Sequence, residues 1–191
     1  MKPASQTQER PLRRGDGACS RQRVLWDHPC STICAMRTVC EAAGGEEGLR
    51  RLARAWHSRV MADEVVSHAF SHGFASDHTE RLSAYWTEAL GGPEAFSAAF
   101  GDESSVVRMH SGNGAHEEMD RRAIACFDRA LGDVGIEPQS QLARALHDYF
   151  AWATTTTMSR YHESAGDVPD ELEIPKWSWD GLVKQTDPVG N

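Results

Sequence analysis

Several features that mark particular classes of protein are missing from this sequence. No apolar run approaches the roughly 18 residues needed to span a membrane, so no transmembrane helix is predicted. The formal net charge is -8, with 28 acidic residues against 20 lysines and arginines, which argues against a surface that binds nucleic acid. Arg13-Arg14 is followed by a polar Gly-Asp-Gly-Ala run where a twin-arginine export signal would have an apolar segment. We therefore predict a cytoplasmic protein with neither a membrane nor a nucleic-acid partner.

The motif Cys-x-x-Cys is also absent, although the chain has five cysteines. They are Cys19, Cys30, Cys34, Cys40 and Cys126. Cys30 and Cys34 are poorly spaced for a zinc knuckle, so reduced thiols are the simpler interpretation. Without Cys-x-x-Cys-His, any haem would be held with no covalent thioether links.

The 191 residues and 21.1 kDa fit one domain with appendages. Residues 1–35 lack apolar periodicity, and we expect them to be a disordered tail, interpreted as an upstream mis-start or as a segment with no role in the fold. Residues 36–163 form the predicted domain, and 164–191 form a C-terminal extension. Prolines forbid regular helix across most of that extension, yet it carries Trp177 and Trp179, which we expect to lie against the domain or against a partner chain.

Apolar residues within 36–163 recur at the three- and four-residue steps of amphipathic helices. Helices are predicted from residue 46, over 63–70, from an Asp77 N-cap with Glu80 in the capping-box position up to residue 90, over 94–100 and from 117. Residues 101–104 are predicted to be loop, and one last helix is predicted over 139–162, continuing through Thr154–Thr157. No stretch alternates as a β-strand does, and no internal repeat occurs. The predicted fold class is all-α.

His110 is the most informative single residue. It closes the short apolar run Val106-Val107-Arg108-Met109 and is followed at once by the Gly-Asn-Gly break at 112–114. Such a position leaves one ring nitrogen free to point inward, which suits a metal or haem ligand. A helix cap or a core histidine with ordinary partners is the alternative for His110 taken alone.

The surrounding pattern adds to this. Gly44-Gly45 precedes one helix, Leu90-Gly91-Gly92-Pro93 ends another, and His110 follows Pro93 by 17 residues. Over about residues 36–160 the chain resembles the truncated haemoglobins, specifically their second, O-type group. The resemblance implies a 2-over-2 helical sandwich around haem b that binds dioxygen or another diatomic ligand. Nitric oxide or peroxide chemistry would require a separate reductase, and a homodimer is compatible with the family.

The resemblance also implies roles for individual histidines. His110 aligns with the proximal iron ligand, in preference to His116. His78 falls at the distal position one turn before Leu82 on the same face, where the family often has a small residue. His57 stands where a distal tyrosine is expected, and a histidine there could also coordinate iron. The family's tryptophan after the proximal histidine is replaced by Ala123, which removes one indole N–H from the expected pocket.

Other cofactor contacts follow from the same alignment. Phe70, or else Phe74, is expected to stack on the haem at a helix corner, and Arg81 to pair with a propionate. Met109, Phe127 and Trp86 are expected pocket walls, with simple core packing as the alternative.

Two other functions remain open at this stage. One is a non-haem metal site on a helical bundle, for which His68 and His72 share a helical spacing of four. However, no Glu-x-x-His pair of the di-iron bundles occurs. The other is a haem-free globin-fold interaction protein that uses the Trp177 and Trp179 tail as its contact surface.

Overall fold

The computed structural model divides the chain into two units, Met1–Ala35 and Met36–Asn191, and describes residues 37–71 and 73–183, all within the second unit. The expected disordered tail therefore lies outside the described residues. The elements in chain order are α1 Val39–Ala42, α2 Gly45–Ala62, the 3-10 helix η1 Val66–Phe70, α3 His78–Ala89, α4 Ala95–Ala99, α5 Glu103–His110, α6 Glu117–Asp133, α7 Gln141–Trp152, the π-helix η2 Ala153–Met158, the 3-10 helix η3 Ala165–Asp167, β1 Trp177–Ser178 and β2 Gly181–Leu182.

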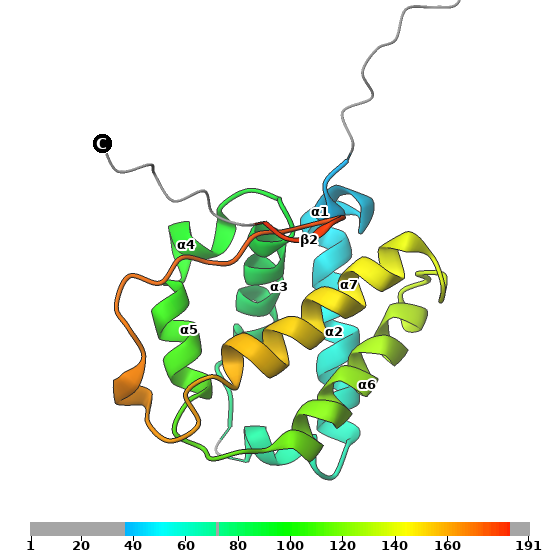
Figure 1. Ribbon diagram of the computed structural model, residues 1–191. Coiled ribbons are helices and arrows are strands. Elements are labelled where there is room, and N and C mark those ends of the chain that lie inside the picture. Colours follow the sequence, from blue (N-terminus) through cyan, green and yellow to red (C-terminus); the bar gives the residue numbers. More distant parts are fainter. Residues whose placement is uncertain (1–36, 72, 184–191) are drawn as a thin grey trace, which may run out of the picture. The chain divides into compact units, whose positions relative to one another are not determined.

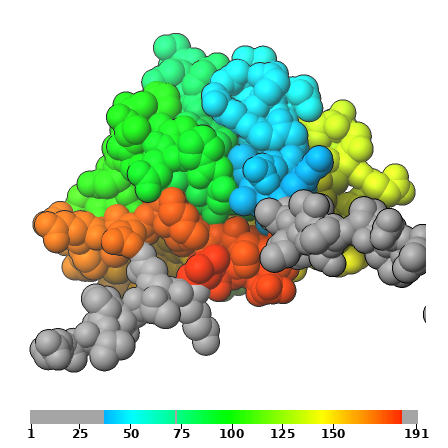
Figure 2. Space-filling model, turned by 90° about the horizontal axis from the view of Figure 1, so that it is seen from above, coloured from blue at the N-terminus to red at the C-terminus, as the bar shows by residue number. Residues whose placement is uncertain are grey.

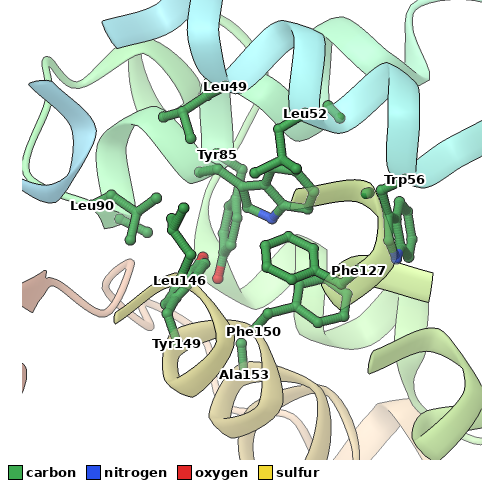
Figure 3. Packing of buried hydrophobic residues seen from close by; sticks show 14 of the residues in the cluster. Leu49, Leu52, Trp56, Tyr85, Leu90, Phe127, Leu146, Tyr149, Phe150 and Ala153 are labelled. Carbon is green, nitrogen blue, oxygen red and sulfur yellow. The ribbon is translucent and has the colours of Figure 1, made fainter. Parts of the chain in front are cut away.

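Four long helices form the core of the unit, paired as α2 with α3 and α6 with α7 (Figure 1). Helix α2 packs against α3 and α6, and α6 packs against α7. The face of α2 that was predicted to be apolar is buried, from Leu49 to Val60. Phe127 of α6 and Phe150 of α7 stack with ring centroids 4.2 Å apart (Figure 3). Trp86 of α3 meets both rings edge-on. The all-α prediction is confirmed for the helical body.

The two glycines of the Leu-Gly-Gly-Pro motif stand where a side chain would be strained or would clash. Gly91 has a φ of +87°, in the left-handed region that favours glycine at the end of a helix. A Cβ on Gly92 would stand 2.7 Å from the carbonyl oxygen of Thr87 and 2.8 Å from Sγ of Cys40. Here α1 is joined to the end of α3, because the Cys40 N–H donates to the Leu90 carbonyl at 3.0 Å. The double glycine lets these two segments approach.

The predicted start of α3 is confirmed without its predicted capping hydrogen bond, and the predicted start of α5 was wrong. Asp77 precedes α3, but its side chain accepts no capping hydrogen bond and lies 3.6 Å from Arg81 instead. Helix α5 begins at Glu103, within the predicted loop, because the Asp102 carboxylate caps it by accepting from the Ser105 N–H at 2.7 Å.

The predicted helix over 139–162 is present in part. Helix α7 ends at Trp152, and the chain stays helical through the threonine run as the π-helix η2, which ends at Met158. The Thr155 hydroxyl donates to the Ala151 carbonyl at 2.8 Å, and the Ser159 hydroxyl donates to the Thr154 carbonyl at 2.7 Å. Side-chain hydroxyls thus compete for the carbonyls of the last turns, and β-branched residues crowd a regular α-helix.

The C-terminal segment ends in a small hairpin that the sequence did not predict, with Trp177 paired to Leu182 and Ser178 to Gly181. Trp177 is buried against Tyr149 and Trp152, with ring centroids 5.9 and 5.4 Å away. The expectation that the tryptophans lie against the domain is confirmed for Trp177. In the described residues no helix combines the length and the apolar character that crossing a bilayer requires.

We predict that Phe150→Ala lowers the free energy of unfolding by about 3–5 kcal/mol, because it removes a ring that is only 7% exposed and stacked on Phe127. Leu182→Ala, at a side chain that is 44% exposed, is the control and should change it by less than about 1 kcal/mol. Urea denaturation followed by circular dichroism measures both. Equal effects would show that the core does not centre on this stack.

Candidate haem site

Four aromatic rings meet where α2, η1 and the start of α3 converge. His57 lies on α2, Phe70 ends η1, Phe74 lies in the following loop and His78 is the first residue of α3. The His57 ring centroid lies 4.6 Å from Phe74, 5.5 Å from Phe70 and 5.2 Å from His78. His78 in turn lies 5.4 Å from Phe70 and 5.7 Å from Phe74. The structure therefore brings together all four residues expected on this side.

The two histidines of this cluster each have one buried ring nitrogen without a hydrogen-bond partner. Nε2 of His57 and Nε2 of His78 are both buried and have no hydrogen-bond partner. Burial lowers the pKa of both imidazoles, because it disfavours the charged form. Both rings are thus held neutral, each with a nitrogen that could serve a ligand.

His110 is the last residue of α5, and its tautomer follows from its backbone contact. Its Nδ1 lies 2.8 Å from the carbonyl oxygen of Val106. A carbonyl can only accept, so Nδ1 carries the proton and Nε2 of the neutral ring has the free lone pair. Burial is the main cause that lowers the pKa of His110. The residue as a whole is nevertheless exposed to solvent.

His110 also has an electrostatic effect on the aromatic cluster. The pKa of His78 is lowered first by burial and then by the repulsion that the protonated forms of His57 and His110 would exert on it. His78 at the start of α3 is therefore within electrostatic range of one imidazole on α2 and of one at the end of α5.

The remaining predicted contacts are placed differently. Leu82 is half-buried against the core, and Trp86 and Phe127 are core residues that touch each other. Met109 is 68% exposed. The guanidinium of Arg81 lies over the Phe100 ring at 5.1 Å and donates to the Phe100 carbonyl at 3.2 Å. Arg81 thus has partners within the protein.

His116 has a different environment from His110. Its Nδ1 lies 2.8 Å from the Asp120 carboxylate, which also accepts from the Ser159 hydroxyl at 2.9 Å. The His162 ring is 5.8 Å away. At the position where the family tryptophan was expected, the Ala123 carbonyl accepts from the Trp56 indole N–H at 3.2 Å.

Among residues 37–71 and 73–183, no group of three His, Cys, Asp or Glu side chains is placed to hold a metal ion. His72, half of the pair considered for zinc, lies outside the described residues.

Sequence reasoning missed a buried acid at the first residue of α5, the helix that ends at His110. Glu103 is 2% exposed and accepts from the Tyr85 hydroxyl at 2.8 Å, while its second oxygen has no partner. Burial raises the pKa of Glu103 to about 7, against the lowering effect of the Tyr85 hydrogen bond. The rings of Tyr85 and Tyr149 extend into the same part of the core (Figure 3). An acid directly after Asp102 looks like a surface residue, so the sequence carried no signal for it.

The pKa of Glu103 predicts a pH dependence of stability. A carboxyl whose pKa is raised on folding binds its proton more tightly in the folded state, so its contribution is lost as pH rises from about 4.5 to above 7. Glu103→Gln removes this term and should stabilise the protein by about 3 kcal/mol at pH 8, with little effect below pH 4.5. Urea denaturation of both proteins across that range measures the difference. A gap that does not grow with pH would contradict the assignment.

Comparison with known proteins places this geometry in a family. The model of the bacterial-like globins matches residues 38–155. The haemoglobin of the actinobacterium Thermobifida fusca is 28% identical, with 64% of this chain and 97% of that chain covered and a TM-score of 0.53. The haemoglobin of Chloroflexus aurantiacus is 22% identical over 65% of this chain and 99% of that one, with a TM-score of 0.56. The group II truncated haemoglobin of Bacillus anthracis is 19% identical over 69% and 98%, with a TM-score of 0.58. No protein of curated function matches.

Because the family model spans more than half of the chain, this protein belongs to the bacterial-like globin family, which implies a haem-binding globin of the truncated type.

Proposed function

We propose that this globin holds haem b through Nε2 of His110 and reversibly binds dioxygen or another diatomic ligand on the side of His57 and His78. The observation that carries the proposal is the hydrogen bonding of the three imidazoles, each of which has an Nε2 atom without a partner among the described residues. His110 has its Nδ1 committed to a backbone carbonyl, and the other two have buried Nε2 atoms without partners.

These residues fit a haem group. A proximal histidine of this kind needs a neutral ring, a free Nε2 and a backbone acceptor that fixes its orientation, and His110 has all three. Two orphaned buried nitrogens are costly unless a ligand uses them. Haem would supply the iron to which a diatomic molecule binds and with which it can exchange electrons. The chain has no Cys-x-x-Cys-His, which favours haem b over a covalently attached haem.

The protein's own contribution is to place donors and exclude water. His57 and His78 are neutral, so each can present one N–H to a polarised diatomic ligand. Phe70 and Phe74 surround both rings and lower the local polarity. A hydrogen bond to a polarised acceptor is stronger in such an environment than in water.

The proposal predicts a haem spectrum that depends on His110. Purified with haem, the wild type should give an intense Soret band in the ferric and the reduced states, and His110→Ala should abolish or strongly alter it. His116→Ala is the matched control and should leave the spectrum unchanged, because that ring is bound to Asp120. Failure of the wild type to take up haem would refute the proposal.

The distal pair predicts an effect on ligand release. Hydrogen bonds of this kind are worth about 1.5–3 kcal/mol, so His78→Ala should speed dioxygen dissociation by roughly tenfold to a hundredfold, as measured by stopped-flow displacement with carbon monoxide. His57→Ala should act in the same direction, and His147→Ala, at a surface pair with Asp128, should have no effect. Unchanged dissociation in both distal variants would show that neither ring donates to the ligand.

A further inference from the structure

The helix that carries His110 depends on segments far along the chain. Helix α5 has only eight residues, and an isolated helix of that length is not stable in water. The elements that it packs against most are η2 and η3, which both follow α7 (Figure 1). The position of His110 is therefore set largely by C-terminal residues.

We use the term strap for residues 161–179, which run along α5 and on to α1 (Figures 1 and 2). The strap contacts the first turn of α5, where the Leu172 N–H donates to the buried Ser104 hydroxyl at 2.9 Å. It also contacts the last turn, where the Arg108 guanidinium donates to the carbonyls of Val168 and Pro169 at 3.3 and 3.4 Å and pairs with Asp170.

The strap holds the loop after His110 as well. The Gly112 N–H donates to the Tyr161 carbonyl at 3.0 Å, and the Gly114 N–H donates to the His162 carbonyl at 2.9 Å. Both ends of α5 and the loop that leaves it are thus hydrogen-bonded to one segment.

The strap is itself anchored to the helical body at its far end. Trp177 is buried against α7, Lys176 pairs with the buried Glu88 carboxylate of α3 at 3.1 Å, and the Trp179 indole donates to the Arg37 carbonyl at 2.6 Å. Because the strap is anchored at this far end, α5 could not move without breaking its hydrogen bonds to the strap or pulling the strap from its anchor. The family model ends at residue 155, so it does not include this arrangement.

We propose that the strap is a positioning device for the proximal histidine: through Ser104 and Arg108 it fixes α5, and thereby the distance and tilt at which Nε2 of His110 meets the haem iron. The proposal rests on the proposed function for its effect on haem, and on the hydrogen bonds above for its mechanical part. Ser104 and Arg108 are positioning residues, because they act only through His110.

The test compares variants of the contacts between the strap and α5 with a variant outside them, in the full-length protein. The double variant Ser104→Ala/Arg108→Met removes side-chain contacts between the strap and α5, and Asp170→Asn weakens one of them from the strap side. Leu182→Ala is the matched control, because its side chain is 44% exposed, lies just beyond the strap and makes none of the contacts with α5. The iron–histidine stretching band of the reduced protein, read by resonance Raman, reports the bond itself. Hydrogen exchange of the α5 amides in the haem-free protein reports the helix alone.

We expect the double variant to shift the iron–histidine band and to speed exchange in α5 by roughly fivefold or more, as the loss of at least one net hydrogen bond implies. Asp170→Asn should change both in the same direction by less, and Leu182→Ala should change neither. Lower thermal stability in all variants with an unmoved band would overturn the proposal. Lack of haem uptake by the wild type would refute the proposed function, whereas α5 exchange unaffected in the double variant would refute the strap.

Discussion

The direction of His57 depends on the burial of its neighbour Trp56. Trp56 points into the core, where its ring meets Trp86 and Phe150 edge-on and its indole N–H donates to the Ala123 carbonyl of α6. Successive residues of an α-helix point about 100° apart, so fixing Trp56 aims His57 out of the core and towards Phe70, Phe74 and His78. The packing of α2 between α3 and α6 thus determines the geometry of the distal cluster.

The site combines three imidazoles whose protonation is suppressed by their surroundings. No carboxylate is hydrogen-bonded to His57, His78 or His110 in the described residues, and the main cause that lowers each pKa is burial. A neutral imidazole has one N–H to donate and one lone pair to offer to iron, whereas an imidazolium ion has two N–H groups and no lone pair. The Val106 carbonyl adds the last requirement, since it decides which nitrogen of His110 is free.

Much of the fold followed from periodicity, and much of the site followed from resemblance. The apolar face of α2 and the helix from His78 to Ala89 were predicted from spacing, and the convergence of His57 and His78 with Phe70 and Phe74 was predicted through the family alignment. The failures have two different causes. Glu103 is buried by a contact between separate helices, where α3 and α5 meet. Thr154 lies in a π-helix because nearby hydroxyls take carbonyls that α7 needs. Helical spacing of apolar residues contains neither effect.

The close approach at Gly92 also determines the chemistry of a thiol. Cys40 is buried beside Gly92, and burial raises its pKa, so its sulfur remains a protonated thiol rather than a nucleophilic thiolate. The burial that comes with the contact between α1 and the end of α3 therefore makes Cys40 a poor target for oxidants.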